Sequence, residues 1–268
     1  MRVFRSVAEL QFDAPKVGFV PTMGALHEGH VSLMRRAKLE CGFCVASIFV
    51  NPTQFGPNED FNKYPRDEAR DFELAKSAGV DAVFCPSVES VYNGSTTTVR
   101  VGGVTDLWEG PLRPGHFEGV ATVVHKLFGM VRPTIAYFGL KDFQQCCVIA
   151  KMVSDLYLPI ELVFCETVRE PDGLAMSSRN RYLSQEERAL APRIYAVLNQ
   201  VSGSTSGLSE ALLEGRTALQ NIGFRVEYLA AVNTVMQPIE TREPNSRLIV
   251  AAWLGTTRLI DNIALTKS

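Results

Sequence analysis

The segment FVPTMGALHEGHVSLMRR, residues 19–36, decides the predicted fold. Its apolar start belongs to a predicted strand at Val17–Val20, Gly24 provides a tight turn, and the sequence HEGH (residues 27–30) precedes an amphipathic helix. The first turn of a helix carries backbone N–H groups without intrahelical partners and a partial positive charge, and small residues let an anion approach it. Strand, turn and helix start therefore predict a phosphate-binding site.

The two histidines of this segment are candidate ligand-binding residues. His27 and His30 are three residues apart, so they lie on one side of a helical turn. The alternative is that each is solvated or fills a loop. Two of the chain's four histidines, however, lie in one HxGH sequence, which is more specific than a glycine pattern alone. This spacing favours contact with the ligand.

The composition is that of an ordinary globular protein, with 46% hydrophobic and 21% charged residues. A length of 268 residues suits a large domain and a smaller one. The net charge is −2 and basic residues are scattered, which predicts no nucleic-acid partner. No apolar run approaches the ~20 residues of a membrane span, and the N-terminus lacks a signal-peptide pattern. We expect a cytoplasmic protein without a membrane partner.

The six cysteines lie mostly in apolar segments, as small buried side chains of a reducing compartment do. Cys41 and Cys44 form a CxxC sequence. A second such pair for zinc is missing, and Cys44 begins an apolar run, so packing is favoured over a metal or redox role.

Apolar runs alternate along the chain with segments of helical periodicity. This pattern predicts an α/β fold, a Rossmann-like parallel sheet under crossover helices. The predicted strands are Val17–Val20, Cys44–Val50, Asp81–Cys85, Ile135–Phe138 and Ile160–Cys165. The predicted helices are a short one ending near Ala14, the one after HEGH, Asp67–Ala78, Val120–Val131 and one that begins in the segment 139–145.

The pattern changes near Thr167, where we place a domain boundary. A capping box at Ser184–Glu187 begins a helix to about Val201, and SGSTSG (residues 202–207) is a connection. The remaining predicted elements are a helix at Ser209–Asn221 and strands at Val226–Val232, Leu248–Leu254 and Arg258–Ile263. They predict a smaller α+β domain with an antiparallel sheet over residues 168–268.

Three more polar clusters stand at strand ends or at the boundary: NPTQ (51–54), GLKDFQQ (139–145) and MSSRN (176–180). Ligands of open α/β sheets bind outside the carboxyl ends of the strands, so we expect these clusters to meet HEGH in one crevice. A simple turn is the alternative for NPTQ. Lys141 and Arg179 bring positive charge without a nucleophilic triad, which fits a transferring phosphoryl group.

The loop PLRPGHF (111–117) holds Arg113 and His116 in a rigid Pro-Gly frame. It is either a surface loop or a mobile active-site segment, and the sequence leaves both open. His125, in the apolar helix that follows, is interpreted as a packing or surface residue.

HEGH resembles the HIGH motif of the nucleotidyl-transferase superfamily, and MSSR resembles its KMSKS loop, with Arg179 in place of lysine. The strings PTMGALHEGH (21–30) and FVNPTQFGPNEDFNKYPR (49–66) are similar to the pantoate–β-alanine ligase family, a resemblance that covers the chain to about Leu183 and continues more loosely beyond. It implies a homodimeric, AMP-forming ligase that joins (R)-pantoate to β-alanine through a pantoyl adenylate and releases pyrophosphate.

The resemblance also implies a role for each domain. Residues 1–167 would bind nucleotide and pantoate, and residues 168–268 would form a lid that carries the MSSRN loop and keeps water from the adenylate.

The resemblance implies site residues by position. Those implied for ATP are Met23, Gly24, Ala25, Leu26, His27, Glu28, Gly29, His30, Gly139, Leu140, Lys141, Asp142, Val168, Met176, Ser177, Ser178 and Arg179. Gln54 and Gln145 are implied for pantoate, and Gln54 with Asn51 for the β-alanine pocket. His30 is implied as the catalytic proton donor, while His27, Lys141 and Arg179 share the developing charge. Many relatives carry a charged or amide residue where this chain has Leu140, so contact of that loop with the base stays open.

Mg²⁺ is expected on the ATP triphosphate, held mainly by phosphates and water with one or two carboxylates. Asp71 is a candidate carboxylate ligand. The alternative is a solvated acidic helix face that Asp71 shares with Asp67 and Glu68.

Three other functions compete with the ligase. A nucleotidyl transferase would stop at a nucleotidylated product, although NPTQ and KDFQQ resemble a small hydroxy-acid pocket. A nucleotide-binding regulatory protein would bind ATP without turnover. A transfer-RNA synthetase would need a basic surface for RNA, which the charge pattern does not provide.

Overall fold

The structure, a computed structural model, describes residues 1–57 and 59–265, so the last three residues of the predicted second domain lie outside it. The chain divides into two compact units. The first comprises Met1–Gly139 and Val148–Glu166, and the second comprises Leu140–Cys147 and the chain from Thr167 on. The short segment Leu140–Cys147, predicted to belong to the first domain, thus clusters with the second unit.

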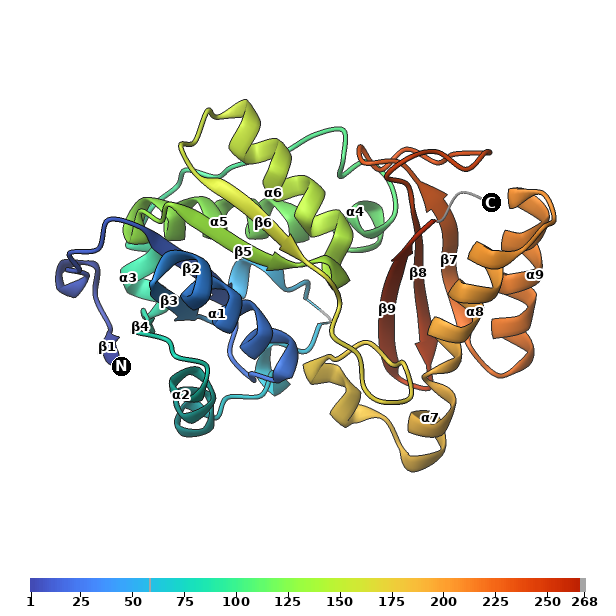
Figure 1. The fold of residues 1–268 in the computed structure, drawn as a ribbon, viewed down its shortest axis with the longest axis horizontal. Helices are drawn as coiled ribbons and strands as arrows, with labels where there is room; N and C mark the ends of the chain where they lie inside the picture. The colour runs from blue at the N-terminus through green and yellow to red at the C-terminus, as the bar shows by residue number, and fades with distance from the viewer. Residues whose placement is uncertain (58, 266–268) are drawn as a thin grey trace. The chain divides into compact units, whose positions relative to one another are not determined.

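A six-stranded parallel sheet forms the centre of the first unit (Figure 1). The strand order is β1-β4-β3-β2-β5-β6. The chain leaves β2 for β3 on one side and later returns to β5 on the other, so β2 and β5 border a topological switch point, where open α/β sheets bind ligands. The strands are β1 (Arg2–Phe4), β2 (Val17–Thr22), β3 (Phe43–Ile48), β4 (Ala82–Phe84), β5 (Ile135–Gly139) and β6 (Glu161–Cys165).

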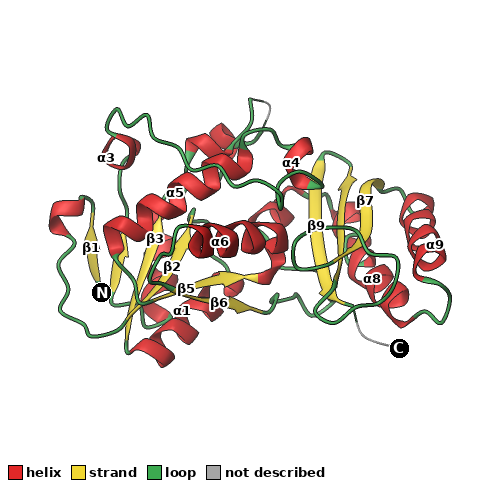
Figure 2. Ribbon diagram, turned by 90° about the horizontal axis from the view of Figure 1, so that it is seen from above, coloured by secondary structure: helices red, strands yellow, loops and turns green. Residues whose placement is uncertain are grey.

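Helices cover both faces of this sheet, with α1 (Glu28–Cys41) and α5 (His116–Val131) on opposite sides (Figure 2). Successive residues of a strand point to opposite faces. The Phe19 ring meets Phe128 of α5 edge to face at 6.4 Å between centroids, whereas Val20 belongs to the core cluster that contains Met34 of α1. This two-sided burial explains the unbroken apolar runs from which a parallel sheet was predicted.

The predicted fold class is confirmed. The predicted strands and long helices of the first unit correspond to elements within a few residues, and α2 begins after its N-cap Asp67, whose side chain accepts the Arg70 N–H. The other helices of this part are α2 (Glu68–Ser77), α3 (Val88–Tyr92) and α4 (Glu109–Leu112), while α6 (Phe143–Asp155) begins in the segment that clusters with the second unit.

The prediction of an N-terminal helix was wrong. Arg2–Phe4 form β1 at the edge of the sheet, and Val7–Glu9 form only a short 3-10 turn. The Arg2 N–H donates to the Asp81 carbonyl at 2.8 Å, and the Cys85 N–H donates to the Phe4 carbonyl at 2.8 Å. Pairing with the exposed edge of β4 therefore overrides the helical spacing of the apolar residues.

The second unit is built on the antiparallel sheet β7-β8-β9, with α8 and α9 together on one of its faces (Figure 1). Gly215 of α9 has no side chain, and a Cβ there would lie 2.6 Å from a Val201 methyl of α8, so glycine permits the close approach of the two helices. The elements are α7 (Gln185–Leu190), α8 (Arg193–Gly203), α9 (Leu208–Asn221), β7 (Arg225–Val232), β8 (Arg247–Leu254) and β9 (Thr257–Ala264).

The predicted single helix from the capping box to Val201 is in fact two helices. The capping box at Ser184 is present, but α7 ends at Leu190 and α8 begins at Arg193. Pro192 lies between them, and its ring lacks the N–H that would continue the helical ladder.

All six cysteines are free thiols, and five of them are buried. Burial raises the pKa of the Cys44 thiol to about 12, which keeps it protonated. This agrees with the packing role favoured for the CxxC sequence.

None of the helices in residues 1–57 and 59–265 is long and apolar enough to cross a membrane.

Candidate active site

The first turn of α1 is capped by its own two histidines. His27 is the N-cap residue, and its Nδ1 accepts the Gly29 N–H at 3.1 Å. The Nδ1 of His30 accepts the His27 N–H at 3.3 Å, and the ring centroids lie 4.1 Å apart. An Nδ1 that accepts carries no hydrogen, so each neutral ring has its proton on Nε2. The cap therefore fixes the tautomer and the orientation of both imidazoles.

Asp71 of α2 holds the turn that leads into this helix. Its two carboxylate oxygens accept the Ala25 N–H at 2.9 Å and the Leu26 N–H at 2.7 Å. Gly24 and Ala25 have positive φ angles of 78° and 49°, and a Cβ on Gly24 would lie 2.8 Å from an Asp71 oxygen. Glycine at this position lets the carboxylate approach two successive left-handed residues.

Two interpretations of Asp71 made from the sequence need correction. The residue is only 2% exposed, so it does not share a solvated acidic face. Both oxygens bind backbone N–H groups, which gives Asp71 a positioning role in place of the metal-ligand role. Burial raises the pKa of Asp71, and the two backbone hydrogen bonds oppose that effect. The described residues contain no group of three or more His, Cys, Asp or Glu side chains that could hold a metal ion.

Asn51, which follows β3, is buried and fully engaged within the protein. Its Oδ1 accepts from the Tyr92 hydroxyl at 2.6 Å and from the Thr53 hydroxyl and N–H. Its Nδ2 donates to the Gln54 Oε1 at 3.1 Å and to the Gly119 carbonyl at 3.2 Å. Because these contacts occupy both ends of the amide, Asn51 positions Gln54.

Gln54 faces the turn after β2. Its Nε2 lies 3.0 Å from the Met23 sulfur, while its Oε1 is held by Asn51. A thioether is a weak acceptor. The segment after β3 and the segment after β2 thus meet at the carboxyl edge of the sheet, as predicted from the sequence.

The loop with Arg113 and His116 is exposed at Pro111, Leu112, Pro114 and Gly115, but it turns His116 inward. His116 is 8% exposed, and its ring contacts both the Gln54 carbonyl and the Arg113 guanidinium. Sequence spacing gave no sign of this contact, because 62 residues separate His116 from Gln54.

The second unit holds the other predicted residues. The Nδ2 of Asn262 in β9 donates to the Leu140 carbonyl at 2.8 Å and to the Lys141 carbonyl at 2.9 Å, which fixes the backbone of the Lys141 turn. The Lys141 ammonium lies 3.6 Å from the Asp142 carboxylate. Gln145 is half-buried in the first turns of α6.

The MSSRN segment lies beside Val168 within this unit. The Met176 N–H donates to the Val168 carbonyl at 3.0 Å, so two residues predicted for ATP are neighbours across a short hairpin. Ser177 caps a 3-10 helix at Ser178–Tyr182 by accepting the Arg179 N–H. The conformation of this loop is thus set by hydrogen bonds between its own residues.

Each unit therefore gathers its own share of the predicted residues. In the first unit these are the segment 23–30, Asn51, Gln54 and Gly139, the last of which ends β5 beside the switch point. In the second unit they are residues 140–142, Gln145, Val168 and residues 176–179.

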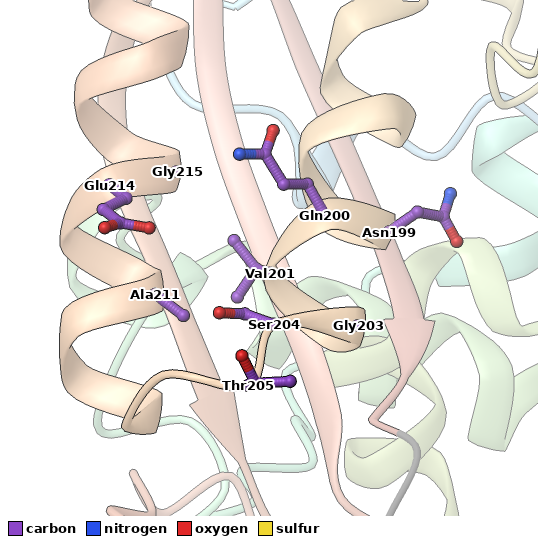
Figure 3. Close-up of a pocket in the computed structure, with 9 residues that line it drawn as sticks. All are labelled: Asn199, Gln200, Val201, Gly203, Ser204, Thr205, Ala211, Glu214 and Gly215. Atoms are coloured by element: carbon purple, nitrogen blue, oxygen red, sulfur yellow. The ribbon is translucent and has the colours of Figure 1, made fainter. Parts of the chain in front are cut away.

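One pocket in the described part of the chain, about 420 Å³ in volume, lies elsewhere (Figure 3). It is formed by the end of α8 and the first half of α9, with Asn199, Ser204 and Glu214 among its lining residues. None of the predicted site residues lines it.

A parallel sheet with polar segments at the carboxyl ends of its strands, and paired histidines at the N-terminus of the helix after β2, defines an α/β nucleotide-binding enzyme of the HIGH type. The model of the pantoate-beta-alanine ligase family matches residues 2–264. The chain therefore belongs to the pantoate-beta-alanine ligase family.

Individual relatives agree with this assignment over the whole chain. A pantothenate synthetase of Thermus thermophilus is 51% identical over 98% of this chain and 99% of its own length. A crystal structure of that organism's enzyme has a TM-score of 0.96 and covers 100% of both chains at 50% identity. The Francisella tularensis pantoate-beta-alanine ligase, crystallised with beta-gamma ATP and beta-alanine, has a TM-score of 0.83 at 34% identity and covers 100% of this chain and 99% of its own. The predicted family and the predicted acid–amine ligase are thereby confirmed.

Proposed function

We propose that the protein condenses (R)-pantoate with β-alanine to give pantothenate, while ATP is converted to AMP and pyrophosphate. The observation that carries the proposal is the histidine cap of α1, because it presents two oriented imidazoles at a positively polarised helix start. Family membership supports the same reaction.

In the first half-reaction a carboxylate oxygen of pantoate attacks the α-phosphorus of ATP. The bond from that phosphorus to the bridging oxygen breaks, and pyrophosphate leaves with the electron pair. A neutral imidazole with its proton on Nε2 is a donor to phosphoryl oxygens, so His27 and His30 stabilise the developing charge, with His30 as the proton donor. Lys141 and Arg179 supply positive charge to the same nucleotide.

Gln54 is proposed to bind pantoate through its amide nitrogen. Asn51 holds the Gln54 Oε1, and this leaves Nε2 directed at the Met23 sulfur. A carboxylate or hydroxyl oxygen accepts a hydrogen bond more strongly than a thioether does, so bound pantoate replaces that contact. Gln145 supplies the second amide of the pantoate site.

In the second half-reaction the deprotonated amine of β-alanine attacks the acyl carbon of pantoyl adenylate. The bond from that carbon to the AMP oxygen breaks, AMP leaves, and the nitrogen loses a proton as the amide forms. The adenylate is sensitive to hydrolysis, and we propose that residues 168–268 close over it as a lid with the Ser177–Arg179 loop.

Three further features belong to this proposal. Mg²⁺ accompanies the ATP triphosphate and is held mainly by phosphate oxygens and water. The protein is cytoplasmic, in keeping with its free thiols and its use of ATP. It acts as a homodimer, as the family resemblance implies.

Product analysis tests the proposal. Purified protein is incubated with ATP, pantoate and β-alanine, and AMP, pyrophosphate and pantothenate are quantified with each substrate omitted in turn. We expect equal amounts of the three products only when all substrates are present. Binding of ATP without any product would favour the regulatory protein, and sustained pyrophosphate release that never needs an amine would favour a nucleotidyl transferase.

A further inference from the structure

Three side chains form a linear chain of contacts that ends on the backbone of Gln54. The Arg113 guanidinium binds Glu59 with two contacts of 2.7 Å, from Nε to Oε1 and from Nη2 to Oε2. Its Nη1 lies 2.9 Å from the Nε2 of His116, and the Nδ1 of His116 lies 2.8 Å from the Gln54 carbonyl oxygen. A rigid bidentate ion pair thus aims one guanidinium nitrogen at a buried imidazole.

The partners of His116 determine its tautomer. A carbonyl oxygen can only accept, so the Nδ1 of His116 carries the proton and donates to Gln54. A guanidinium can only donate, so the Nε2 accepts from Arg113. Burial, followed by the positive charge of Arg113, lowers the pKa of His116 from 6.5 to about 4, although the hydrogen bond to the Gln54 carbonyl and the carboxylates of Glu59 and Glu109 oppose this. The neutral, singly protonated ring is therefore the form present near neutral pH.

The segment that carries Gln54 is tethered to α5 at a second point. A Cβ on Gly119 would lie 2.4 Å from the Thr53 carbonyl oxygen, so the segment rests directly on the bare helix backbone. The Asn51 Nδ2 donates to the Gly119 carbonyl at 3.2 Å. The first turns of α5 therefore hold both ends of the segment, through Asn51 at its start and His116 at its end.

We propose that Glu59, Arg113 and His116 are positioning residues that set the placement of Gln54 for the acid substrate. The proposal rests on the proposed function, which assigns Gln54 to pantoate. Asn51 orients the Gln54 side chain and His116 fixes its carbonyl, so one residue is held from two sides. The contacts of these three side chains lead to Gln54 and not into the apolar core, so the three side chains are not a packing cluster.

Two substitutions of His116 separate positioning from packing. His116→Asn keeps an amide nitrogen at the place of Nδ1, whereas His116→Gln moves the amide toward the place of Nε2 and abandons the Gln54 carbonyl. For His116→Gln we expect KM for pantoate to rise by at least about tenfold, with KM for ATP within about twofold of wild type. For His116→Asn we expect KM for pantoate to rise by less than about threefold.

A double-mutant cycle with Gln54→Ala tests whether His116 acts through Gln54. In the Gln54→Ala background His116→Gln should cause no further rise in KM for pantoate, because the group that it positions is gone. Additive effects of the two substitutions would overturn the proposal, and so would a folded His116→Gln protein with unchanged KM for pantoate.

Hydrogen exchange provides a readout that does not depend on the identity of the substrate. The Thr53 N–H is bonded to Asn51 and the Phe55 N–H to the Pro52 carbonyl, and both should exchange faster in His116→Gln than in wild type. If pantoate supports no turnover, the proposed function fails, and the exchange rates still decide whether His116 holds the segment. Unchanged exchange would overturn the positioning role.

Control variants complete the experiment. Glu68→Gln removes the exposed ion pair with Arg5 elsewhere in the first unit and should change neither KM nor the exchange of residues 53 and 55. If His116→Gln does not fold, Arg113→Met and Glu59→Gln weaken the same chain of contacts from its less buried end. Both should raise KM for pantoate selectively, and an unchanged KM in both would refute the proposal.

Discussion

The Nδ1 of His30 accepts the backbone N–H of His27 at 3.3 Å, so two candidate catalytic side chains also cap the N-terminus of α1. The same hydrogen bonds therefore cap the helix and orient the imidazoles. Substitution can separate the two, because a Gln side chain at the position of His30 can take over the capping contact.

His30→Ala should reduce pantoate-dependent pyrophosphate release by at least about 100-fold, because the proton donor is lost. Its free energy of unfolding should fall by only about 1 kcal/mol, the usual cost of a lost cap contact. His30→Gln is the matched variant, because Gln is a favoured residue at this third position of a capping box, and it should recover stability without recovering activity. Near-normal turnover in either variant, measured by steady-state pyrophosphate release, would contradict the role of His30.

Asp71→Asn should destabilise the turn before α1 by about 1–3 kcal/mol, because an amide has one acceptor oxygen where the carboxylate serves two N–H groups. Urea unfolding measures the loss. Asp67→Asn, the same change four residues earlier, should have little effect because Asn is an equally good N-cap. Equal stability of the two variants would show that the turn does not depend on Asp71.

Two glycines of α5 make a matched pair. Gly119→Ala would place a Cβ 2.4 Å from the Thr53 carbonyl oxygen and should cost about 1–3 kcal/mol of stability and raise KM for pantoate. Gly129 has open space at its Cβ position, so Gly129→Ala should stabilise the protein by about 0.5–1 kcal/mol and leave kinetics unchanged. Thermal unfolding and KM together check both, and a harmless Gly119→Ala would be inconsistent with the tethered segment.

His116 should make stability depend on pH. Its pKa is about 4 in the folded protein against an ordinary 6.5, so the unfolded chain binds more protons between these values. The free energy of unfolding should therefore fall as the pH drops from about 6.5 to about 4. His116→Asn should lack this component in urea titrations at matched ionic strength, and identical slopes for both proteins would contradict the buried neutral imidazole.

The sequence predicted those parts of the site that depend on local pattern. The HEGH segment, the strand before it and the NPTQ segment each combine periodicity with a turn signal, and the structure places them together at one sheet edge. Contacts between distant residues were not predictable in this way. Asp71 and His116 act on residues 45 and 62 positions away, and neither is marked by its neighbours in the sequence.

The errors in secondary structure have similar causes. The N-terminal residues pair with β4, a tertiary contact that local apolar spacing cannot reveal. The break between α7 and α8 was marked by Pro192 and should have been expected.

The two-step reaction is tested most directly by pyrophosphate release from ATP and pantoate in a rapid-mixing experiment without β-alanine. The account predicts a pantoate-dependent burst no larger than the enzyme concentration, which becomes continuous when β-alanine is added and is then accompanied by AMP and pantothenate. Absence of a pantoate-dependent burst, or continuous release without any amine, would contradict it.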